Sequence, residues 1–179
     1  MEAAEVAETF SNDRQVLDSA RGGSEEAGRR LMREHGPSML RAAWHVLGRY
    51  GGMDAEDVVQ EAFLTALTTE ALPYGDVGAW LRSIAVRKAL DATRLARRRA
   101  EVAGESPRSA APSIETLAVR QALSRLSAAD RAVLVLVELE GRSMAEAAVA
   151  LGTTNVGTRL RAVRARRKLA RLLSGRETP

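Results

Sequence analysis

Five arginines crowd the last helix that the sequence predicts, and guanidinium groups at this density are suited to binding nucleic acid. They are Arg159, Arg161, Arg164, Arg166 and Arg167. Arginine donates paired hydrogen bonds to phosphates and to the major-groove edge of guanine. A compact domain gains little from such crowding unless a polyanion neutralises the charge. DNA is therefore the first partner to expect, although a GC-rich genome would also enrich arginine and leaves that explanation open.

A short helix and a glycine turn precede this basic helix. Ser143 and Glu146 have the spacing of a capping box, and Gly152 stops the helix that it follows. Two helices on a tight turn, the second one basic, are typical of a helix-turn-helix. The predicted contacts to duplex DNA are Thr154, Asn155, Arg159, Arg161 and Arg164.

A second block, residues 54–63, is acidic. Asp54, Asp57 and Glu61 recur at spacings of three and four, on one exposed helical face, while Val59 and Phe63 point inward. Acidic residues in a first turn also favour the helix dipole, so a solvated, well-capped helix would explain them. The alternative is a surface that docks on another protein, because acid at this place would repel DNA.

A third block, residues 79–94, combines a tryptophan with a basic helix. Arg82, Arg87, Lys88 and Arg94 form a cationic surface beside Trp80. Such a helix can follow phosphates and stack an unpaired base on its aromatic ring. A buried tryptophan in a helix fringed with arginine is the simpler alternative.

Composition limits the remaining possibilities. The chain has 179 residues with a net charge of +4, and only 3% of them are aromatic, so its core must be aliphatic. It has no cysteine, which excludes disulfides, thiolate metal sites and cysteine nucleophiles and fits a reducing compartment. No apolar run reaches the roughly 18 residues of a membrane helix. We therefore expect a soluble, cytoplasmic protein.

Helical periodicity runs along the whole chain and predicts an all-α fold. The β-branched run 133–137 would pass as a strand, but it follows a capped helix start and has no partner strand. We expect two small helical domains, 26–99 and 114–175, the second of them the helix-turn-helix. An acidic, flexible or weakly helical lead, 1–25, precedes them, and a flexible proline-containing linker, 100–113, joins them.

The three blocks, in this order, resemble an extracytoplasmic-function (ECF) sigma factor of bacterial RNA polymerase. DAEDVVQEAF resembles sigma region 2.2, and WLRSIA with a later Asp and Arg resembles regions 2.3 and 2.4. The segment ALSRLSAADRAVLVLVELEGRSMAEAAVALG resembles region 4 with its helix-turn-helix. The resemblance covers residues 30–98 and 118–172.

The resemblance implies a promoter-specificity subunit without catalytic activity. Its partners would be promoter DNA and core RNA polymerase, through the β′ clamp and the β flap, and an anti-sigma factor is a further candidate. Core docking would use Asp54, Asp57, Gln60, Glu61 and Phe63. Recognition of the −10 element would use Trp80, Arg82, Arg87, Lys88 and Arg94, with a flipped base in the loop 68–77. The helix-turn-helix residues given above would read the −35 element.

One feature departs from the family pattern, and a second leaves open which face of the basic helix is buried. Val86 and Arg87 stand where the family usually has Arg-Asn, which leaves the −10 sequence preference open. The basic helix has two apolar stripes on different faces: one is Val156, Leu160 and Val163, and the other is Thr158, Ala162, Ala165, Leu169 and Leu172. Burial of the first stripe would shorten the turn by about two residues, whereas burial of the second would turn Val156 and Leu160 outward.

Other functions have less support. A stand-alone helix-turn-helix regulator explains the last third of the chain but neither the acidic block nor the Trp80 helix. An enzyme would need a site, and the sequence has no Gly-rich phosphate loop and no G-x-S-x-G. His35 and His45 are ten residues apart on one expected helix and do not share a face, so no metal and no cofactor is predicted. A purely structural bundle would leave the arginines unexplained.

Overall fold

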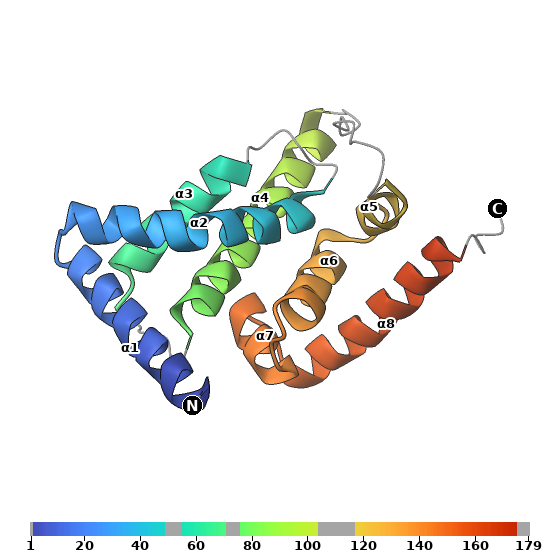
Figure 1. Ribbon diagram of the computed structural model, residues 1–179. Coiled ribbons are helices and arrows are strands. Elements are labelled where there is room, and N and C mark those ends of the chain that lie inside the picture. The colour runs from blue at the N-terminus through green and yellow to red at the C-terminus, as the bar shows by residue number, and fades with distance from the viewer. Residues whose placement is uncertain (1, 49–54, 71–75, 104–116, 175–179) are drawn as a thin grey trace.

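The computed structural model describes residues 2–48, 55–70, 76–103 and 117–174, and the regular elements in these ranges are all helical (Figure 1). The all-α prediction is confirmed. In chain order the elements are α1 (Glu2–Arg21), α2 (Glu25–Leu47), α3 (Ala55–Thr68), α4 (Val77–Ala103), α5 (Leu117–Ser124), α6 (Ala128–Leu134), the π-helical turn η2 (Val135–Leu139), α7 (Met144–Leu151) and α8 (Asn155–Leu173).

The first four helices form one packed unit. Ser24 caps α2 by accepting a hydrogen bond from the amide of Ala27, and α2 then packs against both α3 and α4. Aliphatic side chains at helical spacing fill the interior, as the scarcity of aromatic residues predicts. Among those buried are Leu31, Met39, Val46, Val58 and Leu81. This packing fixes which faces of α3 and α4 remain available to partners.

The lead at residues 1–25, expected to be flexible or weakly helical, is largely the helix α1, which packs against α2, α3 and α4. Leu17 is fully buried, and Asp13 and Ala20, four residues before Leu17 and three after it, are buried on the same face. At the end of α1, Arg21 donates hydrogen bonds from Nε and Nη2 to the carbonyl of Ala66, at 3.1 and 2.9 Å. That carbonyl is in the last turn of α3, where the helix itself leaves acceptors unpaired. The acidic composition of this segment concealed its buried stripe.

The C-terminal helices form the predicted helix-turn-helix domain. Ser127, Ser143 and Thr154 are the N-caps of α6, α7 and α8, and Gly152 ends α7 in the left-handed conformation. The β-branched run at 133–137 is helical, as predicted, and changes from α to π geometry at Val135. The predicted linker is helical up to Ala103, as the end of α4, and its remainder lies outside the described residues.

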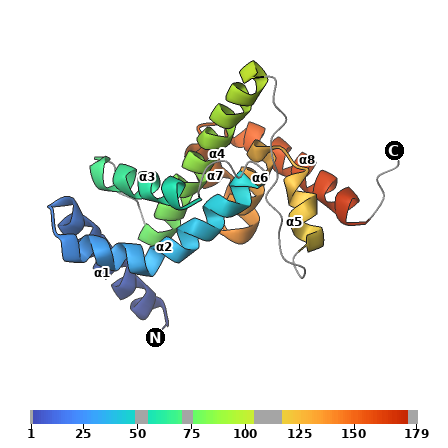
Figure 2. The same cartoon turned by 90° about the horizontal axis from the view of Figure 1, so that it is seen from above.

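The larger of two hydrophobic clusters spans both domains, which the sequence does not predict, and a smaller one lies within the C-terminal domain. Ala132, Val133 and Leu136 belong to the same buried cluster as Val46 and Leu81. Figures 1 and 2 both show α6 beside the C-terminal end of α2, and α6 and α7 contact α4. The two domains therefore form a closed arrangement in this structure.

Arg131 of α6 is the polar centre of this contact and is only 1% exposed. Its guanidinium donates to the carbonyl of Val46 from Nε and Nη2, at 2.9 and 2.7 Å, and to that of Leu47 at 3.3 Å. It also donates to the carbonyl of Leu126, at 2.7 Å. A cation at the C-terminus of α2 interacts favourably with the helix dipole. One domain thus caps a helix of the other.

Gly48 lets this arginine approach, which yields a first prediction. Its φ is +56°, and a Cβ at this position would lie 2.9 Å from Cζ of Arg131. Gly141 has a similar φ of +62° but nothing within 4 Å of its Cβ position. We expect Gly48→Ala to lower the midpoint of urea unfolding clearly more than Gly141→Ala, because only the former also displaces a buried guanidinium. Equal losses would mean that backbone strain alone sets the effect.

Candidate protein-binding and DNA-binding surfaces

The structure settles which stripe of the basic helix α8 is buried. Thr158, Ala162 and Ala165 are buried, and Leu169 is partly buried, so the second stripe faces the domain core. Thr154 caps α8 by accepting from the amide of Gly157, at 3.1 Å. The turn therefore needs no shortening, and Val156, Leu160 and Val163 point into solvent.

The arginines of α8 fall into two groups. Arg161 pairs with Asp130 at 3.4 Å, and Arg166 pairs with Glu138 at 2.5 Å. Arg159 and Arg164 are exposed and make no ion pair with any residue that the structure describes. Of the predicted DNA contacts, Asn155 is exposed at the helix start, while the Thr154 side chain is engaged in capping. Arg167 and Arg171 are exposed as well, so Arg159 and Arg164 are the predicted DNA-contacting arginines that have no ion-pair partner among the described residues.

The acidic helix α3 presents three of its predicted residues to solvent. Asp57, Gln60 and Glu61 are exposed, and Glu61 lies 3.9 Å from the ammonium of Lys88 on α4. Asp54 lies outside the described residues. Phe63, also predicted for docking, is only 8% exposed and packs in the core beneath this face.

Sequence reasoning missed an apolar member of this face. Leu64 is exposed and lies three residues after Glu61 and four after Gln60. The same spacing of three and four that groups the acids also places Leu64 beside them. A single exposed leucine is common on protein surfaces, and here it adds an apolar group to an otherwise acidic face.

The structure does not bring the predicted −10 residues together as a free cationic surface. Arg82 pairs with Glu140 of the other domain and lies 3.7 Å from Asp76. Arg94 pairs with Asp91 on its own helix, and Lys88 faces α3. Arg87 is exposed, with Nη2 3.9 Å from the Cβ position of Gly152 in the helix-turn-helix turn.

Trp80 is also engaged within the protein. It is partly buried, and the guanidinium of Arg21 lies over its ring at 5.7 Å from the centroid, a cation–π distance. Part of the loop 68–77, where the resemblance implies a flipped base, lies outside the described residues (71–75). The contact between the domains therefore occupies Arg82, whereas Trp80, Lys88 and Arg94 are engaged within the N-terminal unit itself.

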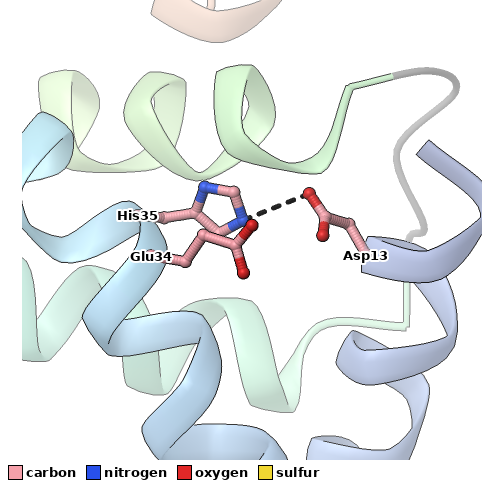
Figure 3. Close-up of side chains that lie close together, drawn as sticks. All are labelled: Asp13, Glu34 and His35. Carbon is pink, nitrogen blue, oxygen red and sulfur yellow. Dashed lines mark ion pairs between the residues drawn. The ribbon is translucent and has the colours of Figure 1, made fainter. Parts of the chain in front are cut away.

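A buried pair fixes α1 to α2 (Figure 3). Nε2 of His35 lies 3.3 Å from Oδ2 of Asp13, and Glu34 lies beside them. Burial raises the pKa of Asp13, and the nearby His35 opposes that rise. Glu34 lies 3.7 Å from Arg30, which gives its carboxylate an ion-pair partner on its own helix. Gly78 of α4 approaches closely, since a Cβ there would be 2.8 Å from Nδ1 of His35. His35 thus joins three helices, a role that its place in the sequence does not reveal.

The capping box of α7 gives a pH-dependent prediction. Hydrogen bonds from the hydroxyl and the amide of Ser143, together with Arg142, hold the pKa of Glu146 below 4.5. A lowered pKa in the folded state means that the stabilisation is present above about pH 4.5 and is lost as the pH falls through the folded value. We expect Glu146→Gln to speed hydrogen exchange at the Ser143 amide about fivefold at pH 7 and much less at pH 3. An equal effect at both pH values would contradict this account.

Two stretches of the chain match known regions of transcription factors. Residues 31–99 match sigma-70 region 2, and residues 116–169 match sigma-70 region 4. Together they cover more than half of the chain, and they coincide with the two helical domains described above. The protein is therefore a sigma factor of RNA polymerase, which acts in transcription initiation.

Curated relatives and solved structures narrow the class. The chain is 33% identical to the ECF RNA polymerase sigma factor SigM of Mycobacterium tuberculosis over 90% of this chain and 85% of that protein. It is 31% identical to the RNA polymerase sigma factor NccH of Alcaligenes xylosoxydans xylosoxydans, over 91% and 95% of the two chains. The structure of CnrH in complex with the cytosolic domain of CnrY matches with a TM-score of 0.63 and 30% identity, over 92% of this chain and 99% of that one. The chain belongs to the ECF sigma factors.

A further structure shows the fold alone. RpoE of Bartonella quintana, solved with the anti-sigma factor NepR, matches with a TM-score of 0.67 at 24% identity, over 82% of this chain and 96% of that one. None of the helices that the structure describes has both the length and the apolar character needed to span a bilayer.

Proposed function

We propose that this sigma factor docks on core RNA polymerase through the exposed face of α3 and reads the −35 element with α8. The observation that carries the proposal is the orientation of α8, which presents Arg159 and Arg164 to solvent on the two flanks of the face opposite its buried stripe. This is how a recognition helix must be set to enter a major groove. The docking face comprises Asp57, Gln60, Glu61 and Leu64.

Region 2 would read the −10 element with α4 after the closed arrangement opens. Arg82, Arg87, Lys88 and Arg94 line α4, with Trp80 at its start. Glu140 must leave Arg82, as the domains separate, before that arginine can meet a phosphate. Arg21 of α1 must leave Trp80 in a separate movement within the N-terminal unit before a base can stack on the ring. Core polymerase, which binds α3 in this proposal, is the natural agent of that opening.

The test is retention on core RNA polymerase that lacks any other sigma factor. We expect the wild type to be retained and Asp57→Arg/Glu61→Arg to be lost, because two carboxylates of the docking face become cations. The matched control is Asp18→Arg/Glu26→Arg, which changes the net charge equally at exposed acids of α1 and α2. Loss of the control as well would show a general charge effect. Failure of the folded wild type to bind would overturn the proposal.

An anti-sigma partner is proposed as well. The similar structure of CnrH was solved with the cytosolic domain of CnrY, and the present chain already has its two domains in contact. A protein that binds across both domains can contact them together only while they are close to each other. It would therefore bind the closed form more tightly than the open form and stabilise it.

A further inference from the structure

The surface of α8 that faces away from the domain core is unusual because its centre is aliphatic. Val156 is 76% exposed, Leu160 49% and Val163 41%. Their spacing of four and three places them on one face of the helix, and Thr158, Ala162 and Ala165 are buried on the opposite face. This aliphatic face, Val156, Leu160 and Val163, is therefore the part of α8 that points most directly outward.

The helices of this domain do not use the aliphatic face. α8 packs against α5, α6 and α7, and it does so through the buried stripe. The aliphatic face is therefore free of contacts with α5, α6 and α7 and can meet an external partner.

Charge around the aliphatic face indicates what that partner is. Arg159 and Arg164 flank it on its two sides, and Arg167 lies near its centre line, all exposed. An apolar protein surface would have to desolvate these guanidinium groups, which is unfavourable without carboxylates to meet them. A polyanion with an apolar feature between its charges fits both the arginines and the aliphatic side chains.

The DNA major groove has that combination. Its edges carry hydrogen-bond donors and acceptors, and its characteristic apolar group is the C5 methyl of thymine. Valine and leucine offer no donor or acceptor, so against any other base edge they would remove water from a polar group and give nothing back. From Val156 to Val163 the helix rises about 10 Å, the length of about three base pairs.

We propose that the aliphatic face specifies thymine in the −35 element by contact with C5 methyl groups, with Leu160 as the central contact. The proposal rests on the proposed function, because it requires α8 to lie in the major groove. The arginines then anchor the helix on phosphates or guanines, while the aliphatic face selects the bases between them.

The test uses the reconstituted holoenzyme. A duplex library selected on it supplies the −35 element, in which we expect thymine at one to three neighbouring positions. Each thymine is then replaced by deoxyuridine, which lacks only the methyl group. We expect at least one such change to weaken holoenzyme binding about fourfold, the value for one buried methyl. Leu160→Ser should bind the thymine and deoxyuridine duplexes equally at that position.

The control is Leu139→Ser, an exposed leucine on η2 in the same domain, which should keep the full thymine preference. Specific binding without sensitivity to deoxyuridine would overturn the inference and leave the proposed function standing. If the wild type is retained on core polymerase but the holoenzyme binds no duplex specifically, the proposal that α8 reads the −35 element is overturned, and the inference with it. Loss of core retention in Leu160→Ser, with no change in thymine preference, would assign the aliphatic face to a protein contact and overturn the inference.

Discussion

Replacing Arg131 by methionine is expected to lower the free energy of unfolding by about 3–5 kcal/mol and to separate the two domains, because several buried backbone acceptors lose their donor. Methionine roughly fills the volume of the arginine stem but donates no hydrogen bond. The carbonyls of Val46, Leu47 and Leu126 accept from this guanidinium, and as backbone groups they cannot be replaced along with it. A buried acceptor left without a donor costs about 1–3 kcal/mol.

Urea unfolding measures the stability loss, and small-angle scattering measures the separation as a larger radius of gyration. Arg171→Met, at an exposed position of α8, is the control for loss of a positive charge. A milder variant, Arg82→Gln, removes the ion pair with Glu140 across the domain contact together with the 3.7 Å contact to Asp76. An Arg131→Met protein with unchanged stability and radius of gyration would show that the capping of α2 contributes nothing.

The second large effect concerns DNA. We expect Arg159→Ala/Arg164→Ala to weaken holoenzyme binding to its −35 element about 100-fold, since an arginine that contacts bases is worth about 1–3 kcal/mol. These two arginines make no ion pair with the described residues, so their full charge is available to the groove.

The matched control is Arg161→Ala/Arg166→Ala, which removes the same charge from the same helix. Asp130 and Glu138 already neutralise these two side chains, so we expect a smaller loss of affinity. Titration at several salt concentrations separates the causes, because each lost phosphate contact lowers the slope of log affinity against log salt by about 1. Equal losses in the two double variants would show that α8 acts only as a diffuse positive charge.

The sequence alone predicts those features of the fold, such as helix starts and stops, that depend on local periodicity and capping. The capping box of Ser143 and Glu146 and the stop at Gly152 are in place because they need only their own helix and turn. The buried face of α8 was beyond reach, since both of its stripes are apolar and only the packing of α6 and α7 selects between them. The small side chains of Ala162 and Ala165 permit that close packing, whereas Leu160 would not.

The contacts between distant segments left no readable signal. Arg131 looks like an ordinary surface arginine of an amphipathic helix, and its burial depends on the end of α2, about 85 residues earlier. His35 is likewise unremarkable until α1 brings Asp13 to it. In α1 the acidic residues dominate the composition, and Leu17 alone is too weak a pattern to predict docking.

The ion pair between Arg82 and Glu140 has a thermodynamic consequence for promoter affinity. A promoter that needs Arg82 can bind only the fraction of molecules in which the ion pair between Arg82 and Glu140 is broken. The apparent dissociation constant is then the intrinsic one divided by that fraction. Where Arg82 contacts the promoter, as proposed, Glu140 competes with DNA for this arginine, and a substitution at Glu140 would change promoter affinity while Arg82 itself is unchanged.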